Sequence, residues 1–461
     1  MKVMVRSVFI GFVVSILICL NARAQLVIEI TQGLNDAIPI AVVPFGVPGP
    51  VVPTVDVAEV IHNDLARSGR FAPLERRDMI DKPASGDQIQ FTDWRLLKSN
   101  FIAVGRLIPE GTDRYAVQFE LYNVLNGQRL LGQRIVSSTA ALRATAHRIA
   151  DMIFEQLTGI PGVFSTRVAY LNVEGTPPRQ RYKMTVADSD GANPRVIANS
   201  GEPIMSPAWS PDGQSLAYVS FENKMAAIYV QTLTTGVRTK VSARAGINGA
   251  PAWSPDGRKL ALTLSRKDGD VDVYTLELAS QMLTRMTFDP GIDTEPTWSL
   301  DGSKLYYTSD RSGSPQIYEV NSSDPRANPR RITFEGRYNA RPRISPDGKQ
   351  LALVTQTGNG FNIALLDLKT NALQVLTGGR QDESPSFAPN GAQLIYATQD
   401  RGRGVLALVS SDGRSQQKLG ATSGEVREPV WGPLPANCSG AAVVRPESGL
   451  RAGRRCGNIE H

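Results

Sequence analysis

The side chains best suited to acid–base or metal chemistry are few and far apart in this 461-residue chain. Only three histidines occur: His62, His147 and His461. The first two lie in segments with helical periodicity. His147 follows a residue of the apolar stripe, so we expect it to be a partly exposed helix residue rather than a base. No Gly-x-Ser-x-Gly turn, His-Glu-x-x-His pair or phosphate-binding glycine loop is present. The sequence therefore predicts no catalytic residue, cofactor or metal site.

A repeated aspartate and a pair of cysteines are the other candidates for chemistry. The aspartate stands third in Ser-Pro-Asp-Gly or a close variant, where a β-turn favours proline, aspartate and glycine in that order. The turn explains all four copies, which are Asp212, Asp256, Asp301 and Asp347. Cys438 and Cys456 lie near the C-terminus, where either a disulfide or an unstructured tail is compatible with the sequence.

The first 24 residues have the features of a secretion signal. Lys2 and Arg6 precede an apolar run over residues 8–20, and a small-x-small sequence ends at Ala24. The run is shorter than the about 20 apolar residues that a membrane span requires. We predict a signal peptide over 1–24, cleavage that leaves Gln25 at the N-terminus, and an exported chain that is not inserted in the membrane.

The net charge of +6 is concentrated at the two ends of the chain. Three basic residues belong to the signal, and the residues from 435 onward carry a basic surplus of two, which leaves a body of +1. A nearly neutral body without a clustered basic face binds polyanions poorly. The composition therefore disfavours nucleic acid as a partner.

Six copies of one short sequence divide the C-terminal part of the chain. The sequence "PAWSPDG" begins at Pro207 and again at Pro251, and weaker copies follow. Their large apolar anchors recur at spacings of 44, 45, 46, 43 and 44 residues. The anchors are Trp209, Trp253, Trp298, Ile344, Phe387 and Trp431. A fixed period of this length is typical of a repeat architecture.

Each copy is followed by three more strand-like segments, and four short strands in about 44 residues form one blade of a β-propeller. A β-sandwich would explain the alternation but not the repeat. No further strands follow Trp431, whereas three lie upstream of the first full copy, over 166–174, 182–191 and 195–200. We therefore predict a six-bladed propeller over 163–434 whose last blade combines strands from both ends.

Residues 37–162 have a different pattern, which predicts a separate α/β domain. Strands are expected over 38–45, 101–108, 115–124 and 129–138, and helices over 55–68 and 139–157. The predicted fold class is thus multidomain: an N-terminal α/β domain followed by an all-β propeller. Residues 435–461 form a basic tail without regular patterning, to which we assign no function.

Residues 25–33 read "QLVIEITQG" and alternate as a β-strand does. By its pattern alone this segment is compatible with an ordinary edge strand. Its place at the predicted new terminus, ahead of a domain whose first strand begins at Ile38, favours a separable arm over 25–36. A free strand of this kind can extend the sheet of a partner.

Together these features resemble the TolB family of the Tol-Pal envelope system. The resemblance covers about residues 25–434 and rests on specific sequences in a specific order. These are "VVPF" at 42–45, "LTGIPGVFSTRVAY" at 157–170, "MSPAWSPDG" from Met205, "NGAPAWSPDG" from Asn248 and "TEPTWSLDG" from Thr294. Peptidases related to prolyl oligopeptidase carry similar blade sequences. A propeller-containing periplasmic hydrolase is therefore the alternative, although no hydrolase domain is present.

The resemblance implies a monomeric, non-enzymatic adaptor in the periplasm that supports outer-membrane integrity and envelope constriction at cell division. It implies two partners, the lipoprotein Pal and the protein TolA. The TolA-binding arm would comprise Gln25, Leu26, Val27, Ile28, Glu29, Ile30, Thr31, Gln32, Gly33, Leu34, Asn35 and Asp36. The same strand could lie against its own protein in one state and be released in another, with Pal binding as the trigger.

The Pal-binding face is expected where the loops enter the innermost strands, opposite the Ser-Pro-Asp-Gly turns. Its predicted residues are Met205, Ser206, Ile247, Ala250, Thr294, Glu295, Arg341, Asp382 and Glu383. With Asp293, Arg427 and Glu428 included, acids outnumber arginines in this ring by five to two, which predicts a partner loop with a basic side chain. Family members often have histidine where this chain has Ile247, so one polar contact of the family is missing here.

Overall fold

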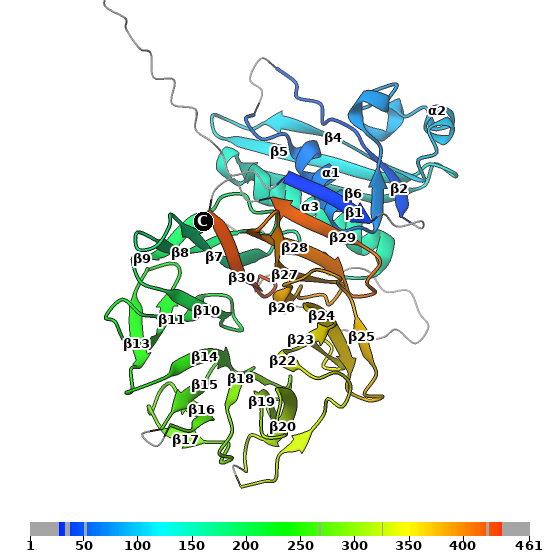
Figure 1. Cartoon of the computed structure of the whole chain (residues 1–461). Coiled ribbons are helices and arrows are strands. Elements are labelled where there is room, and N and C mark those ends of the chain that lie inside the picture. Colours follow the sequence, from blue (N-terminus) through cyan, green and yellow to red (C-terminus); the bar gives the residue numbers. More distant parts are fainter. Residues whose placement is uncertain are drawn as a thin grey trace, which may run out of the picture.

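The computed structural model describes residues 27–32, 37–49, 53–266, 269–324, 326–420 and 424–435. A small α/β domain lies beside a ring of six four-stranded units (Figure 1). The predicted signal peptide, the arm residues Gln25, Leu26 and 33–36, and the tail from 436 with Cys438 and Cys456 lie outside the described residues. Within the described ranges, no helix has the length and apolar character needed to cross a bilayer.

The small domain is a five-stranded sheet covered on one face by two helices. Its strands, in the order β3-β2-β4-β5-β6, are β2 (Ile38–Val42), β3 (Phe71–Pro73), β4 (Phe101–Pro109), β5 (Arg114–Asn123) and β6 (Arg129–Ser138). The helices are α1 (Val57–Arg67), α2 (Phe91–Leu96) and α3 (Leu142–Thr158), with short 3-10 turns η1 (Arg76–Asp78), η2 (Gly86–Gln88) and η3 (Thr139–Ala141). Asp56 caps α1 by accepting the N–H of Glu59 at 3.0 Å. Apolar side chains of α1 and α3 pack with those of β5 in a single core.

The propeller consists of six antiparallel sheets. Four of them are β10 (Ile204–Trp209) to β13 (Arg238–Ser242) through β11 (Ser215–Ser220) and β12 (Ala227–Thr232); β14 (Asn248–Trp253), β15 (Lys259–Ser265), β16 (Val271–Glu277) and β17 (Leu283–Arg285); β18 (Asp293–Trp298), β19 (Lys304–Ser309), β20 (Gln316–Asn321) and β21 (Arg330–Arg331); and β22 (Asn339–Ile344), β23 (Gln350–Thr357), β24 (Gly360–Asp367) and β25 (Leu373–Val375). The last two are β26 (Glu383–Phe387), β27 (Gln393–Asp400), β28 (Arg403–Ser410) and β29 (Gln416–Gly420), and then β30 (Glu425–Trp431) with β7 (Arg167–Glu174), β8 (Arg181–Asp188) and β9 (Arg195–Ser200).

The last sheet closes the ring with strands from both ends of the repeat region, as the repeat count predicts. Its order is β30-β7-β8-β9, so the C-terminal strand pairs with the first propeller strand. Trp431 at the end of β30 donates its indole N–H to the Thr166 hydroxyl at 2.8 Å and its backbone N–H to the Ser386 hydroxyl at 2.9 Å. These bonds connect the closing blade to its neighbour and to the chain just before β7.

The repeated tryptophans connect successive blades. The indole N–H of Trp253 donates to the carbonyl of Ala208 at 3.1 Å, and that of Trp298 donates to the carbonyl of Ala252 at 3.1 Å. Each ring packs between blades while its one polar atom satisfies a backbone carbonyl of the preceding blade. The side chains of the anchors Ile344 and Phe387 have no N–H group to donate such a bond. These two anchors therefore contribute apolar packing alone.

The repeated aspartates stabilise β-turns, which confirms that they are turn residues rather than catalytic acids. The Ser254 hydroxyl donates to Asp256 at 2.6 Å, and the same carboxylate accepts the backbone N–H of Arg258 at 3.0 Å. These hydrogen bonds, with that from Ser254 largest, lower the pKa of Asp256. The same serine–aspartate bond recurs in the other copies, at Asp212, Asp301 and Asp347.

The arm strand β1 (Val27–Gln32) is paired with the propeller, although it precedes the small domain in the sequence (Figure 1). It runs antiparallel to β29 as a fifth strand of that blade, with Val27 opposite Gly420 and Glu29 opposite Lys418. It thereby covers an outer sheet edge that would otherwise present unpaired backbone groups.

Loss of the closing strand is expected to destabilise the whole ring, because β7 would become an exposed edge. We predict that Trp431→Ala lowers the free energy of unfolding by about 3–5 kcal/mol, the usual cost of removing a buried aromatic side chain. Chemical denaturation of the mature chain measures this change. Removing residues 437–461 is the control and should leave the unfolding midpoint unchanged. An unaltered midpoint for Trp431→Ala would contradict a closing role.

Candidate partner-binding face

A bulge interrupts each innermost strand three residues before its anchor. The pairing register shifts there in all six strands, and the residue at the bulge has φ between 44° and 58° although none is a glycine. These residues are Ser206, Ala250, Glu295, Arg341, Ser384 and Glu428, and each is followed by proline. A left-handed conformation costs about 1 kcal/mol or more in a non-glycine residue and is concentrated at functional sites. Here it recurs in every blade.

The six bulged residues line the mouth of the central channel. Together with five of the prolines that follow them, they surround a small cavity of about 40 Å³. Bulges re-aim the side chains of the strand that carries them. The repeated bulge therefore places one side chain of each blade, which differs from copy to copy, at a shared opening.

Glu295 and Arg341 form the centre of this mouth. The Arg341 Nε donates to Glu295 Oε1 at 2.6 Å, and the Arg341 backbone N–H donates to Glu295 Oε2 at 3.1 Å. Another guanidinium nitrogen of Arg341 donates to the hydroxyl of Ser384. Although burial opposes it, the surrounding carboxylates, that of Glu295 foremost, raise the pKa of Arg341. This pair joins three neighbouring blades.

Glu428 supplies a second carboxylate at the mouth. It accepts the backbone N–H of Ser206 at 2.5 Å, so it also bridges two blades. Burial raises the pKa of Glu428, with Arg341 acting in the opposite direction. Nearby, burial lowers the pKa of Arg343, whose side chain lines the same cavity. The mouth thus holds charged groups that are only partly accessible to water.

A larger groove of about 590 Å³ continues from the mouth across the blades of β22–β25, β26–β29 and β30. It contains Glu383, Glu425 and Arg427 and an aromatic pair in which the rings of Tyr338 and Phe361 lie 5.1 Å apart in an edge-to-face arrangement. Tyr338 and Phe361 are partly buried. Charged groups next to partly exposed aromatic rings are typical of a protein-binding site. Among the described residues that line the mouth and groove, no histidine or nucleophile–base pair is present.

The structure brings most of the predicted face together. Ser206, Ala250, Glu295 and Arg341 line the mouth, and Glu383 lies in the adjoining groove. Three others belong to the same loops: Met205 and Thr294 immediately precede bulged residues, and Ile247 is 47% exposed at the loop before β14.

Asp382 and Asp293 do not present free carboxylates to a partner. Asp382 is 1% exposed and accepts hydrogen bonds from the Thr398 hydroxyl at 2.6 Å and the Gly379 N–H at 3.0 Å. Asp293 is fully buried and pairs with Arg311 at 2.8 Å. Both therefore hold the loops in shape, because their oxygens are already bound within the chain.

The burial of these two acids changes the expected charge of the face. Apart from Asp382, four acids and three arginines line the mouth and groove: Glu295, Glu383, Glu425, Glu428, Arg341, Arg343 and Arg427. The excess of acids falls from three to one, and several charges are paired. The prediction of a basic partner loop is therefore weaker. Any charge complementarity between this face and a partner must involve individual side chains rather than an overall acidic surface.

Arg343 was not among the predicted site residues, although the sequence carries a signal for it. It immediately precedes the anchor Ile344, where the other five copies have Ala208, Ala252, Thr297, Ser386 and Val430. A single long cation at a position otherwise occupied by short side chains indicates a special environment. Tyr338 and Phe361 carry no comparable signal in the sequence. The two residues lie in segments that do not correspond to each other in the repeat, so a comparison of its copies does not indicate that their rings meet.

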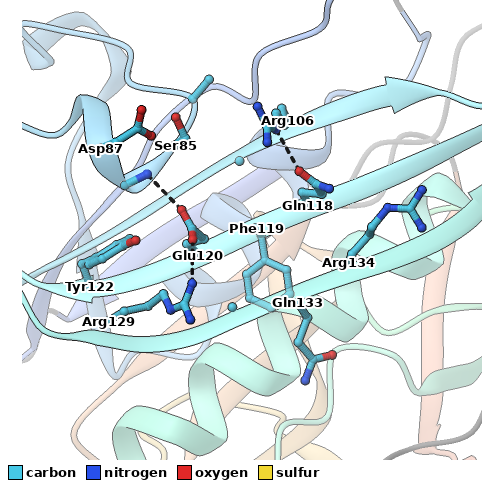
Figure 2. A pocket seen from close by; sticks show the side chains of 14 residues that line it. Ser85, Asp87, Arg106, Gln118, Phe119, Glu120, Tyr122, Arg129, Gln133 and Arg134 are labelled. Atoms are coloured by element: carbon cyan, nitrogen blue, oxygen red, sulfur yellow. Dashed lines mark hydrogen bonds and ion pairs between the residues drawn. The ribbon is translucent and has the colours of Figure 1, made fainter.

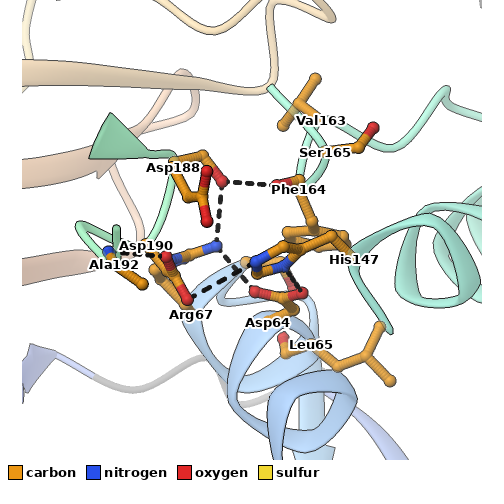
Figure 3. Close-up of polar contacts among 12 residues, drawn as sticks. Asp64, Leu65, Arg67, His147, Val163, Phe164, Ser165, Asp188, Asp190 and Ala192 are labelled. Atoms are coloured by element: carbon orange, nitrogen blue, oxygen red, sulfur yellow. Dashed lines mark hydrogen bonds and ion pairs between the residues drawn. The ribbon is translucent and has the colours of Figure 1, made fainter. Parts of the chain in front are cut away.

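His147 is 2% exposed, so the prediction of a partly exposed helix residue is wrong. It lies where α1 and α3 meet the turn after β8, between Asp64 and Asp190 (Figure 3). The apolar stripe of α3 identifies only the side of the helix that is buried against its own domain. A second, polar side is buried against the propeller, which the helical period cannot reveal.

Ligand atoms of Asp64, His147 and Asp190 lie within 4.8 Å of one another, but the arrangement favours an ion-pair cluster over a metal site. One Asp64 oxygen accepts from Arg67 at 2.9 Å and the other contacts His147 Nδ1 at 2.6 Å. Asp190 is paired with Arg143. Two guanidinium groups beside the carboxylates already supply the positive charge that a metal ion would bring.

A third hollow, of about 580 Å³, lies on the open face of the small-domain sheet (Figure 2). There Glu120 accepts the N–H of Gly86 at 2.9 Å and pairs with Arg129 at 3.1 Å. Arg106 donates to the side chain of Gln118 at 2.8 Å. Ligand pockets are usually lined mainly by apolar side chains. This surface is instead polar and largely self-paired, so we assign it no ligand.

Comparisons with known proteins agree with this architecture. Residues 26–130 match the TolB amino-terminal domain, and residues 154–435 match the TolB beta propeller domain. The Tol-Pal system protein TolB of Xanthomonas euvesicatoria is 47% identical over 425 residues, which is 91% of this chain and 96% of the relative. That of Xanthomonas oryzae is 48% identical over 424 residues, with the same coverage. The crystal structure of TolB from Acinetobacter baumannii superposes with a TM-score of 0.82 at 40% identity, over 89% of this chain and all of the other.

The fold and the channel mouth define a two-domain β-propeller protein whose ring is closed by its own terminal strands and whose variable residues converge on one face. Its sequence is matched over both domains and nearly the full length of its relatives. The chain belongs to the TolB family, the periplasmic β-propeller component of the Tol-Pal cell-envelope system.

Proposed function

We propose that this protein is a non-enzymatic adaptor that binds Pal through the channel-mouth face and TolA through the arm of residues 25–36. Through these contacts it supports outer-membrane integrity and envelope constriction at division. We further propose the division into a cleaved signal over 1–24, the arm, an α/β domain over 37–162, the propeller over 163–434 and a tail over 435–461. The repeated bulge at the channel mouth is the observation that carries the proposal, because it gathers one side chain of every blade at one opening.

The mouth and groove have the properties that a protein loop requires. The Glu295–Arg341 pair is held in place by hydrogen bonds from three blades, so little side-chain freedom is lost when a partner binds. The groove beside it offers the partly exposed Tyr338–Phe361 pair together with unpaired charge at Glu383. Rigid aromatic and charged groups of this kind dominate the energy of protein interfaces.

The arm offers a partner its backbone. In the docked state β1 uses one edge to pair with β29, and a partner sheet would pair with an edge of the same strand. We propose that docking and TolA binding compete. Val27 lies opposite Gly420, only five residues before Glu425, which is the first residue of β30 and lines the groove of the proposed Pal face. The end of the arm is therefore close to the loops through which Pal binding would act.

A capture experiment with purified components tests the adaptor proposal. The mature chain, with and without residues 25–36, is immobilised and offered Pal and the periplasmic part of TolA separately. Capture of Pal by both forms and of TolA by the full form alone is expected. Capture of neither partner by the full form would contradict the proposal, and loss of Pal by the shortened form would show that the segment is structural.

A further inference from the structure

The contact between the small domain and the propeller has an ionic cluster at its centre. Asp64 on α1 contacts His147 Nδ1 on α3 at 2.6 Å, and His147 Nε2 lies 3.7 Å from Asp190 in the turn between β8 and β9 (Figure 3). Arg67 donates to Asp64 at 2.9 Å and to the Ser189 hydroxyl at 3.3 Å. The imidazole thus stands between a carboxylate of each domain.

The charges that face His147 balance only when its ring is protonated. The carboxylates are Asp64 on α1 and Asp188 and Asp190 at the β8–β9 turn, and the guanidinium groups are Arg67 on α1 and Arg143 on α3. Three negative and two positive charges leave one negative charge, which an imidazolium neutralises. The Nε2 atom has no hydrogen-bond partner, and as an N–H donor it would be directed to the nearby Asp190.

The electrostatics of the site agree with this assignment. Burial lowers the pKa of His147, but Asp64 and then Asp190 outweigh it, and the pKa is raised. Burial raises the pKa of another group on α3, the carboxyl group of Asp151, to about 6. Asp151 therefore titrates close to the ordinary pKa of histidine. Asp151 accepts the N–H of Phe164 at 2.6 Å in the segment that joins the domains, so it must be separated from His147 by experiment.

Apart from this cluster and the hydrogen bonds to Asp151, two amide side chains among the described residues make uncharged hydrogen bonds across the boundary. Gln393 donates to the carbonyls of Arg67 and Ser68 at 3.2 and 3.0 Å, and Asn390 donates to the carbonyl of Pro161 at 2.8 Å. Polar contacts between domains of one chain commonly permit relative motion. Among the described residues, the ion pairs that cross this boundary belong to the charged cluster.

The orientation of the domains bears directly on the arm. Strand β1 is paired with β29 of the propeller, and only residues 33–37 separate it from β2 of the small domain. At about 3.5 Å per residue, so short a connection spans at most roughly 20 Å. A rotation of the small domain would therefore pull on the docked strand.

We propose that the imidazolium of His147 clamps the small domain to the propeller and thereby keeps the arm docked, so that loss of this charge frees the arm. The role of a freed arm as a TolA-binding strand rests on the function proposed above. The clamp itself concerns only this chain. Because the folded pKa of His147 is raised, its contribution is complete below the ordinary value of about 6.5 and is lost as the pH rises through the folded value.

Hydrogen exchange of the backbone amides in residues 27–32 and 416–420 tests the clamp without any partner. We expect His147→Gln to make these amides exchange about tenfold faster, after correction for intrinsic rates, and to remove their dependence on pH. Asp190→Asn, at a 14% exposed side chain, should act in the same direction if His147→Gln folds poorly. His62→Gln is the matched control, because His62 lies on α1 outside the cluster, and it should leave exchange unchanged.

Titration of the wild-type histidines by nuclear magnetic resonance provides the second measurement. Protection of the arm amides should fall over the same pH interval in which His147 loses its proton. Folded His147→Gln and Asp190→Asn proteins with wild-type protection would overturn the proposal. So would a pH dependence that Asp151→Asn abolishes and His147→Gln retains. Failure of TolA to bind a demonstrably freed arm would instead refute the function proposed for the arm.

Discussion

Removal of residues 25–36 is expected to abolish TolA binding and to leave Pal binding intact. The arm strand is the one described strand outside the two folded domains, and its pairing to β29 is an addition to an otherwise complete four-stranded blade. The blade therefore keeps its core when the strand is absent. We expect the Kd for TolA to rise at least about 100-fold and the Kd for Pal to change less than about threefold. Isothermal titration calorimetry with each partner measures both.

A reversible cross-link tests the same strand without removing it. Glu29 and Lys418 are opposite one another in the pairing of β1 with β29, so Glu29→Cys with Lys418→Cys should form a disulfide. Cys438 and Cys456 are changed to serine to prevent mispairing. The oxidised protein should fail to bind TolA, and reduction should restore binding. The same serine background without the new cysteines is the control.

The outcomes of the cross-link experiment show whether the arm must leave β29 to bind TolA and whether it must leave β29 before Pal binds. Equal TolA binding before and after reduction would show that the docked strand does not have to leave β29. Loss of Pal binding in the oxidised form would show that Pal requires a free arm, which would place arm release before Pal binding rather than after it.

A bulky cation at the channel mouth is expected to abolish Pal binding. Ala250 occupies the bulged position of β14 with φ of 44°, so its backbone already has the left-handed conformation and arginine adds little strain. The new side chain would fill the cavity of about 40 Å³ and meet Arg341 and Arg343. We expect a loss of at least about 2 kcal/mol in binding free energy, or roughly thirtyfold in Kd, with TolA binding unchanged.

The matched control for Ala250→Arg is Ala279→Arg. Ala279 is an exposed residue between β16 and β17 of the same blade, at the end opposite the channel mouth. Both variants add the same charge and volume to one blade. Equal loss of Pal binding in the two would mean that the effect is not local. Unchanged Pal binding in Ala250→Arg would show that the channel-mouth face has been assigned incorrectly.

Much of the fold follows from local features of the sequence. The repeat spacing and the missing strands at its two ends predict the closed ring, and the order β30-β7-β8-β9 agrees with them. Turn residues and alternation are short-range signals, because a β-turn depends on four consecutive residues. The short strand β3 and the helix α2 were not predicted, since neither is long enough to show a period.

The candidate face was only partly predictable. The position of the loops follows from the propeller architecture, which correctly brings Ser206, Ala250, Glu295 and Arg341 to one mouth. Whether each charged side chain is free or already bound within the chain does not follow from the propeller architecture. Asp382 looks in the sequence like any loop acid, yet Thr398, a strand away, binds its carboxylate.

The sequence by itself determined the order of the domains, the number of blades, the closure of the ring and the face on which variable residues gather. These depend on contacts between neighbours in the chain or between copies of one repeat. Tertiary structure alone decided which polar groups are available and which are bound internally. His147 meets Asp64 from 83 residues away and Asp190 from the other domain. Burial and pairing of a charge are set by segments that meet only when the two domains pack, and no local pattern encodes that meeting.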